Sequence, residues 1–328
     1  MNDKTTSPLN IGIVGTGYAA KKRAEAIKSD GRCKLVAVTE SDRARRQEFS
    51  HNFGIKAVDS WQELVNLPEL DLIFICTVNQ GCGAIARAAI LAHLHVVVEY
   101  PLDLEAEVAA EVIELATKNQ LLLHVEHIEI IGGLHQAIKE YLPQIGKVFY
   151  ARYETISSQH SVGQGWKYHR DKFGFPLAAA LSRIHRLTDL FGKVNSVTCS
   201  DRYWDADNSD YFTACLCKAQ LDFDNGVMAE ITYGKGNVFW RSHRTLEIYG
   251  EQGLIFFEGE KGIIVGEHEQ QIPVASRRGL FAKDTAMVLD YLCDRQPLYI
   301  QPQASLNALQ VANAARESAM TGKIVYLD

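Results

Sequence analysis

The sequence predicts an α/β domain with a parallel sheet, followed by an α+β domain with a large, mainly antiparallel open sheet. Two observations support this fold class. Across the first 125 residues, short apolar runs alternate with helical patterns, as in βαβ units. After about residue 145 this alternation stops, and longer strand-like runs follow one another. We therefore expect one domain at residues 1–125 and a second at residues 126–328, with helices at its C-terminal end.

Five short apolar runs form the predicted parallel sheet. They lie at residues 9–14, 35–39, 71–76, 95–99 and 121–125. The runs are apolar on both faces, as expected for strands that helices cover above and below. Helical patterns follow the strands in turn. These patterns lie at residues 19–29, 43–53, 61–67, 84–93 and 104–119.

Longer strands dominate the predicted second domain. They lie at residues 147–157, 196–204, 211–223, 227–233, 245–249, 254–258 and 262–266. Asp224-Asn225-Gly226 predicts a hairpin between two of them, because Asn-Gly supplies the residues with φ > 0 that a tight turn needs. One helix is expected at residues 177–191, and about the last 50 residues are helical again.

Composition limits the function classes. The 34 basic and 40 acidic residues give a formal charge of −6 at pH 7, which argues against nucleic acid and anionic membranes as partners. Seven cysteines without framework spacing are typical of reduced thiols in a reducing compartment. The first ten residues lack the apolar core of a signal peptide, and polar residues and glycines interrupt the apolar stretch at 72–86. We therefore expect a cytoplasmic enzyme that does not bind membranes.

A glycine-containing turn follows the first predicted strand. Gly15, Gly17 and Ala20 fit the G-x-G-x-x-A form of the dinucleotide fingerprint, with a strand before it and a helix after it. The first glycine allows the tight turn, the second lets backbone N–H groups approach a pyrophosphate, and the alanine allows close helix–strand packing. The helix N-terminus then favours the anionic phosphates. The sequence therefore predicts a nicotinamide dinucleotide bound to a Rossmann domain.

Residues after the second strand bear on the choice between NADPH and NADH. Glu40 stands where a carboxylate accepts hydrogen bonds from a ribose diol, which favours NADH. Ser41, Arg43, Arg45 and Arg46 follow at once and suit a 2′-phosphate, which favours NADPH. The alternative for the three arginines is a solvated helix face. We favour NADPH, with NADH as the alternative.

Two further strand ends are expected to face the cofactor, because ligands bind outside the carboxyl ends of parallel strands. One consists of residues 76–79 and the other of residues 99–101. The predicted cofactor-binding residues are Gly15, Thr16, Gly17, Tyr18, Ala19, Glu40, Ser41, Arg43, Thr77, Val78, Asn79, Glu99 and Tyr100.

This layout resembles the glucose-fructose oxidoreductase and inositol dehydrogenase family, in which a Rossmann domain precedes an open antiparallel sheet. Most members carry Glu-Lys-Pro after the fifth strand and Asp-x-x-x-His on a helix of the second domain. This chain has Glu99-Tyr100-Pro101, and Leu181 stands four residues before His185. The lysine and the aspartate are therefore absent. Oxidation of an alcohol needs a base near its hydroxyl, and a tyrosine with an ordinary pKa of about 10 serves poorly.

The same departures resemble the biliverdin reductase branch of that family, and its cyanobacterial type in particular. Glu-Tyr-Pro is the form found there. Residues 123–129 are similar to its Leu-His-x-Glu-His-x-Glu stretch. Residues 173–176, 182–183 and 190–192 resemble its Phe-Gly-Phe-Pro, Ser-Arg and Leu-Phe-Gly pattern. The resemblance implies NAD(P)H-dependent reduction of biliverdin IXα to bilirubin, with hydride added to the central methine carbon and a proton to a central pyrrole nitrogen.

The resemblance also implies a set of site residues. Arg183 is expected to bind a propionate or lactam oxygen, and water or His185 to deliver the proton, since arginine stays protonated. For Tyr100 we favour packing against the nicotinamide over catalysis. The predicted catalytic residues are Arg183, His185 and Tyr100. The predicted substrate-binding residues are Arg183, Arg186, His127, Glu126 and Lys167. Structural hydrogen bonds or helix-surface pairing are the alternative for most of these side chains.

A loop at residues 157–175 is rich in glycine, serine, histidine and aromatic residues. Its rings suit stacking on a tetrapyrrole and its cations suit propionates. The rings belong to Trp166, Tyr168, His169 and Phe173, and the cations to Lys167, Arg170 and Lys172. An ordinary exposed loop is the alternative.

Two other functions are compatible with the sequence. The rivals are a sugar or polyol dehydrogenase of the parent family and a non-catalytic dinucleotide-binding sensor. Cys215 and Cys217 have no second pair at metal-ligand spacing, so we expect no metal. We also expect a monomer, because a large flat substrate would use the open face of the sheet.

Overall fold

The computed structural model describes residues 8–208 and 210–327, which form two compact units. The first unit runs up to residue 103 and also contains residues 107–128 and 278–303, while the remaining residues form the second unit. A single boundary at residue 125, as we expect from the sequence, assigns residues 278–303 to the second domain, whereas in the structure they belong to the first unit. Residues 1–7, where we expect no signal-peptide core, lie outside the described residues.

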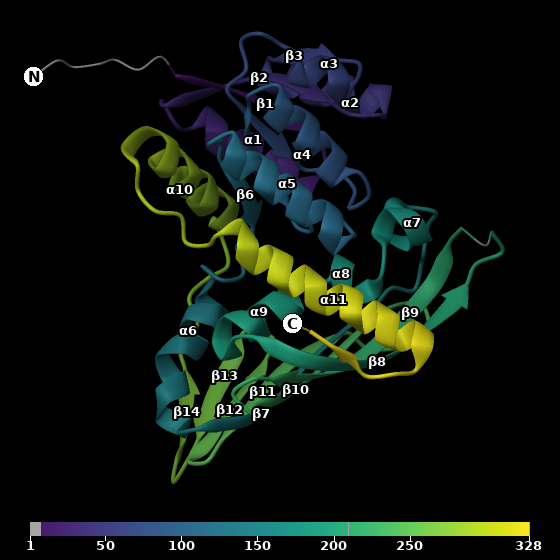
Figure 1. Cartoon of the computed structure of the whole chain (residues 1–328), viewed down its shortest axis with the longest axis vertical. Coiled ribbons are helices and arrows are strands. Elements are labelled where there is room, and N and C mark those ends of the chain that lie inside the picture. Colours follow the sequence, from purple (N-terminus) through teal and green to yellow (C-terminus); the bar gives the residue numbers. More distant parts are fainter. Residues whose placement is uncertain (1–7, 209, 328) are drawn as a thin grey trace, which may run out of the picture. The chain divides into compact units, whose positions relative to one another are not determined.

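Six parallel strands form the sheet of the first unit (Figure 1), in the order β3-β2-β1-β4-β5-β6. The strands are β1 Leu9–Val14, β2 Cys33–Thr39, β3 Lys56–Val58, β4 Leu72–Ile75, β5 His95–Glu99 and β6 Leu123–Glu126. All five predicted strands are present, and the short β3 is an addition. The strand order reverses between β1 and β4, which is the point where open α/β sheets bind ligands.

Helices of this unit bury their apolar faces against the sheet. They are α1 Tyr18–Lys28, α2 Arg43–Phe53, α3 Trp61–Val65, α4 Cys82–Leu91, α5 Ala106–Lys118 and α10 Leu280–Asp294. The side chains of Val288 and Leu289 on α10 are fully buried in one cluster with Ile11 and Phe74. Burial of such side chains contributes about 1.5–3 kcal/mol each. This burial explains why α10 packs with the first unit although it follows the second in sequence.

Nine strands form the sheet of the second unit, in the order β14-β13-β12-β11-β7-β10-β9-β8-β15. The strands are β7 Val148–Ser158, β8 Val194–Asp205, β9 Phe212–Phe223, β10 Met228–Gly236, β11 His243–Gly250, β12 Gly253–Glu258, β13 Lys261–Val265, β14 Glu269–Ile272 and β15 Val325–Tyr326. Only the β7–β10 pair among these described strands is parallel, so the sheet is mainly antiparallel as predicted.

The helix expected at residues 177–191 is broken. Its parts are α8 Pro176–Ala179 and α9 Ser182–Phe191, because Ala180 leaves helical geometry with φ −102° and ψ 31°. The break lets α8 contact β9 while α9 contacts β10, so tertiary packing overrides the local helical pattern. The other helices of this unit are α6 Gly133–Tyr141, α7 Arg170–Phe173 and α11 Pro302–Thr321, with short 3₁₀ turns η1 Leu142–Ile145 and η2 Trp166–Tyr168.

The predicted hairpin between β9 and β10 is present, but its turn differs in detail. Gly226 has φ +86°, whereas the φ of Asn225 is not positive. The Gly226 N–H donates to the Phe223 carbonyl over 2.9 Å, and the Asn225 side chain instead accepts from the Val227 N–H over 3.1 Å. The turn therefore needs only one residue with positive φ.

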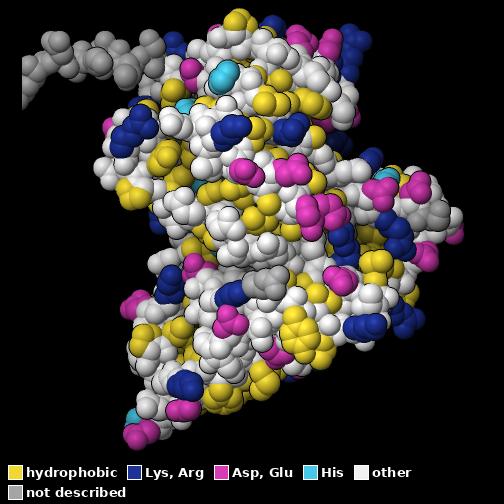
Figure 2. Space-filling model, viewed as in Figure 1, with side chains coloured by type: hydrophobic (Ala, Val, Ile, Leu, Met, Phe, Trp, Pro, Cys, Tyr) yellow, Lys and Arg dark blue, Asp and Glu magenta, His cyan; other side chains and the backbone are white. Residues whose placement is uncertain are grey.

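Surface charge and helix composition bear on the expected partners. On the face shown in Figure 2, Lys and Arg side chains are interspersed with Asp and Glu side chains. This mixture agrees with the small formal charge of −6. Within residues 8–208 and 210–327, no helix is long and apolar enough to cross a membrane.

Gly236 and Gly226 give a matched test of the second unit. Both have positive φ, but a Cβ at Gly236 would lie 2.3 Å from the Thr213 carbonyl oxygen, whereas one at Gly226 would meet no atom within 4 Å. We expect Gly226→Ala to lower the free energy of unfolding by about 1 kcal/mol through backbone strain. Gly236→Ala is expected to lower it by a further ~1–3 kcal/mol through overpacking. Urea unfolding followed by circular dichroism measures both, and equal losses would contradict the argument.

Candidate active site

The fingerprint turn joins β1 to α1 at the carboxyl edge of the first sheet. Gly15 has φ +99°, and a Cβ there would lie 2.2 Å from the Cys76 carbonyl oxygen, so only glycine fits. A Cβ at Gly17 would meet no atom within 4 Å, which leaves the start of α1 open to a ligand. Ala20 is fully buried in the cluster beneath α1. The turn therefore has the cradle that a dinucleotide pyrophosphate requires.

Glu40 lies beside this turn, at the end of β2. Its Oε2 accepts a hydrogen bond from the Thr16 hydroxyl over 3.1 Å. Its Oε1 accepts from the Ser41 N–H over 2.8 Å and from the Ser41 hydroxyl over 2.9 Å. The carboxylate is thus fixed between the fingerprint and the start of the next loop, where the ribose of a dinucleotide lies.

The three arginines after Glu40 have different environments. Arg46 is nearly buried, and its guanidinium donates to the Glu40 carbonyl over 2.8 Å and to an Asp59 carboxylate oxygen over 2.5 Å. Arg46 therefore has a structural role. Arg43 is exposed, and the Arg45 side chain, at 71% exposed, lies 3.6 Å from Asp42. Arg43 and Arg45 remain accessible to an anionic ligand.

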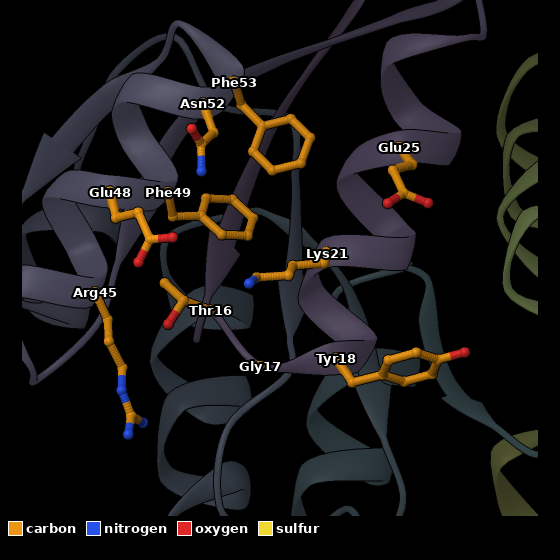
Figure 3. Close-up of a pocket in the computed structure, with 10 residues that line it drawn as sticks. All are labelled: Thr16, Gly17, Tyr18, Lys21, Glu25, Arg45, Glu48, Phe49, Asn52 and Phe53. Atoms are coloured by element: carbon orange, nitrogen blue, oxygen red, sulfur yellow. The ribbon is translucent and has the colours of Figure 1, made fainter.

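A pocket of about 560 Å³ lies between α1 and α2, next to the fingerprint. Figure 3 shows Lys21 extending from α1 toward the Thr16 side of this pocket, while Arg45 lies at the N-terminal end of α2. The pocket is lined by Thr16, Gly17, Tyr18, Lys21, Glu25, Arg45, Glu48, Phe49, Asn52 and Phe53. Sequence reasoning missed Lys21, because one lysine on an amphipathic helix carries no pattern of its own.

The other predicted strand ends follow β4 and β5. Thr77 and Val78 are half-buried, and Asn79 is 8% exposed. Glu99 and Tyr100 are half-buried at the end of β5. The Tyr100 ring stacks on the His127 ring, with centroids 5.1 Å apart and planes 4° from parallel. The structure thus brings two of the predicted site residues into direct contact within the first unit.

A buried arginine joins α1 to this edge of the sheet. The Arg23 side chain is fully buried, and its Nε donates to Glu99 Oε1 over 2.9 Å. Its Nη1 donates to the Asp284 carboxylate on α10. Sequence analysis did not single out Arg23, although it lies on the same helix face as Ala20 and Ala24, which are both buried. A charged residue on a buried helical stripe was the available signal.

Glu126 lies at the end of β6 and pairs in register with Glu99 of β5. Its side chain is 3% exposed, and Oε2 accepts from the Ile128 N–H over 2.9 Å. Burial, followed by the charge of Glu99, raises the pKa of the Glu126 carboxyl well above its ordinary value. The site therefore contains a carboxyl group that resists ionisation beside one that is paired with Arg23.

Helix α9 carries three of the residues predicted in the second unit. Arg183 is half-buried, and its guanidinium lies 5.6 Å from the Tyr233 ring centroid. Arg186 is buried, and its Nη2 donates to Glu129 Oε2 over 3.0 Å. His185 is 1% exposed, and burial lowers its pKa from 6.5 to about 4. At neutral pH the His185 imidazole is therefore uncharged.

The aromatic loop of the second unit is partly in the core. Tyr168 and Phe173 are buried in a cluster with Phe212, and the Lys235 ammonium lies 3.3 Å from the Phe173 ring centroid. The expectation that these two rings stack on a ligand is therefore wrong, because their faces are already in contact with the protein. Lys167 is exposed, as a residue that binds a substrate carboxylate must be.

The six-stranded parallel sheet, its glycine cradle at the switch point and the second α/β unit define a dinucleotide-binding oxidoreductase of two domains. Residues 9–127 match the oxidoreductase family with an NAD-binding Rossmann fold (GFO/IDH/MocA), and residues 139–327 match the C-terminal alpha/beta domain of that family. The chain belongs to this family, and the predicted fold class is confirmed.

Individual relatives confirm the resemblance to biliverdin reductases. The chain is 49% identical to biliverdin reductase from Synechocystis, crystallised in complex with biliverdin and NADP+, with a TM-score of 0.94 and coverage of 96% of this chain and 100% of that one. It is 24% identical to human biliverdin reductase A over 220 residues, which are 66% of this chain and 69% of the human protein. A putative NADPH-dependent oxidoreductase from Desulfitobacterium hafniense shares the fold, with a TM-score of 0.84, 17% identity and 98% coverage of both chains.

His185 gives a pH-dependence test. Burial holds its folded-state pKa at about 4, below the ordinary 6.5. The unfolded chain therefore binds the proton first as the pH falls, so the stability present above pH 6.5 decreases between pH 6.5 and 4, by up to about 3 kcal/mol. We expect His185→Gln to flatten this decrease in urea titrations, and His51→Gln, at an exposed position, to leave it unchanged. The same slope in wild type and His185→Gln would contradict the assignment.

Proposed function

We propose that this protein is an NADPH-dependent biliverdin reductase that reduces the central methine carbon of biliverdin IXα and yields bilirubin. The observation that carries the proposal is the 49% identity, over 96% of this chain, to the Synechocystis enzyme that was crystallised with biliverdin and NADP+. Other oxidoreductases with the same fold are only 16–18% identical to this chain, and such an identity supports a shared fold but not a shared function.

The chemistry at Tyr100 supports the proposal. Tyr100 stands where most members of the family carry the lysine that serves as a base, and its ring is stacked on His127. Bound NADPH supplies the hydride from its nicotinamide C4 carbon. Reduction of a conjugated tetrapyrrole requires a proton at a nitrogen and no removal of a hydroxyl proton, so the protein can lack the lysine base. The site must instead hold a flat acid within about 3–3.5 Å of the nicotinamide.

Residues of the first unit suit each part of the cofactor. Gly15 and Gly17 leave room for the pyrophosphate at the start of α1. Glu40 and Ser41 lie at the ribose position, next to the Thr16 hydroxyl. Accessible cations near this position suit the 2′-phosphate of NADPH, because charge-assisted hydrogen bonds to phosphate are strong. These cations are Lys21, Arg43 and Arg45.

Residues of the second unit suit the anionic groups of the substrate. We assign Arg183 to a propionate or a lactam oxygen, and Lys167 to a second carboxylate. Arg186 stays a predicted substrate-binding residue, and its Nη2 also pairs with Glu129. Because the His185 pKa is about 4, protonation of the pyrrole nitrogen by solvent is easier than by an imidazolium. Glu126, with its raised pKa, and His127 line the Tyr100 side of the first unit.

An absorbance assay tests the proposed function. Purified protein is mixed with biliverdin and either NADPH or NADH at pH 6 and pH 7.5. Loss of the long-wavelength biliverdin band with growth of the bilirubin band is the expected result. A flat trace in all four mixtures, with NADPH binding confirmed by fluorescence, would contradict the proposal. Oxidation of polyols in a parallel assay would then identify a dehydrogenase, and cofactor binding without any turnover would identify a sensor.

Arg183 can be tested with a matched arginine. We expect Arg183→Ala to lower kcat/KM for biliverdin about tenfold to a hundredfold, because one charge-assisted contact contributes about 1.5–3 kcal/mol. The NADPH dissociation constant should change less than about twofold, since Arg183 lies outside the first unit. Arg202→Ala, at an exposed position on β8, is the control and should retain full activity. Unchanged steady-state rates for Arg183→Ala would remove this residue from the site.

The pocket between α1 and α2 predicts the cofactor preference. We expect the double variant Lys21→Ala/Arg45→Ala to raise KM for NADPH about tenfold or more and to leave KM for NADH within about twofold, because only NADPH carries the 2′-phosphate. Lys22→Ala is the control, since Lys22 lies on the same helix but pairs with Glu25 at 2.7 Å. An equal rise in KM for NADPH and for NADH would show that Lys21 and Arg45 do not bind the 2′-phosphate.

A further inference from the structure

Two chains of hydrogen bonds, which we call the first and the second arm, start from one buried carboxylate in the first unit. Asp284 lies on α10 and is fully buried. Its Oδ2 accepts from Arg23 Nη1 on α1. Its Oδ1 accepts from the Tyr299 hydroxyl over 2.7 Å and lies 2.8 Å from His124 Nε2. Oδ2 therefore connects α10 to α1, and Oδ1 connects it to β6 and to the segment after α10.

The first arm runs through Arg23 to Glu99. The Arg23 guanidinium is held between two aromatic rings, with centroids 5.5 Å away at Phe74 and 5.1 Å away at Phe281. Its Nε donates to Glu99 Oε1 over 2.9 Å. The ring contacts and the bond to Asp284 favour one orientation of the guanidinium, and this orientation places a donor at the Glu99 carboxylate.

The second arm runs through Tyr299 to His127. The Tyr299 hydroxyl donates to Asp284 and accepts from the His127 backbone N–H over 3.0 Å. His127 in turn stacks its ring on Tyr100. The two arms therefore each end at a direct neighbour of Tyr100, because Glu99 precedes it in the chain and His127 stacks on its ring.

We propose that Asp284 is a positioning residue for the nicotinamide end of the active site, and that it acts through Arg23 and Tyr299 on the two neighbours of Tyr100. The proposal rests on the proposed function, since it assigns the Tyr100 surface to the reacting end of the cofactor. The alternative is that Asp284 only anchors α10 to the first unit. Although burial disfavours its charge, Arg23 and His124 keep the pKa of the Asp284 carboxyl well below its ordinary value, so the carboxylate stays ionised at the pH of any assay.

The same helix offers a matched control. Asp290 also lies on α10, and its Oδ1 forms an ion pair with Arg32 Nη1 at 2.5 Å. This pair joins α10 to the first unit without contacting Arg23, Tyr299 or Tyr100. Asp284→Asn keeps the shape of the side chain and removes the charge that Arg23 faces. Tyr299→Phe removes only the hydroxyl of the second arm, and Asp290→Asn removes an anchor of α10 alone.

Three quantities are measured for wild type and each variant. They are the NADPH dissociation constant, kcat for biliverdin reduction, and the emission spectrum of bound NADPH, which reports the surroundings of the nicotinamide. We expect kcat to fall about tenfold or more for Asp284→Asn and about threefold to tenfold for Tyr299→Phe, because small displacements of reacting groups slow a reaction strongly. The dissociation constant should stay within about twofold, since the adenosine and pyrophosphate contacts remain. Asp290→Asn should leave all three quantities unchanged while lowering the unfolding midpoint.

Two results would overturn the proposal. One is an unchanged kcat and emission spectrum in Tyr299→Phe and Asp284→Asn. The other is a loss of kcat in Asp290→Asn equal to that in Asp284→Asn, which would show a purely structural anchor. If Asp284→Asn does not fold, Tyr299→Phe decides the question. If wild type does not reduce biliverdin, the proposed function fails, but the emission spectra of bound NADPH still test whether Asp284 positions the nicotinamide.

Discussion

A charged guanidinium that is removed from water needs charged or hydrogen-bonding partners to offset its desolvation, and the fully buried Arg23 finds them in Glu99 and Asp284 of the first unit. Its partners come from distant parts of the chain, since Glu99 lies 76 positions away and Asp284 lies 261 positions away. The fingerprint helix, the end of β5 and helix α10 must therefore be assembled together. Together with the apolar burial of Val288 and Leu289, the pairing holds the returning helix α10 in this unit, and it places the Glu99 carboxyl group, which precedes Tyr100, beside Arg23.

The second unit satisfies a similar condition around α9. Glu129 accepts from the buried Arg186 and from Arg277, so one carboxylate holds two cations. On the other side, His135 lies 2.7 Å from Asp189, which also lies on α9. These contacts hold the middle and the last turn of the helix. Arg183, which we propose as a ligand-binding residue, is half-buried on the same helix.

Local sequence patterns predict most strands and helices of the two units and the position of the glycine turn. Most features that they do not predict depend on pairing between residues far apart in the sequence. The short, continuous apolar runs predict all five main strands of the first sheet, and the fingerprint predicts the position of the cradle at Gly15. The return of α10 and the pairing of Arg23 with Asp284 depend on contacts across 261 positions, which no local pattern encodes, although the buried stripe of α1 marks Arg23 itself. The break before α9 and the burial of Tyr168 likewise follow from packing on the sheet rather than from propensity.

The departures from the family pattern narrow the chemistry that this chain can perform. Leu181, at the position of the family's aspartate, is fully buried at the start of α9, where an unpaired carboxylate would lose its hydration. Four residues later, the imidazole of His185 is kept neutral by burial. The family's lysine and aspartate are thus replaced by Tyr100 in the first unit and Leu181 in the second, although burial lowers the pKa of Lys235 in the second unit to about 7. The loss of the family's lysine and aspartate is therefore compatible with the proposed hydride addition to an acidic, conjugated electrophile, which needs anion binding and correct placement rather than deprotonation of an alcohol.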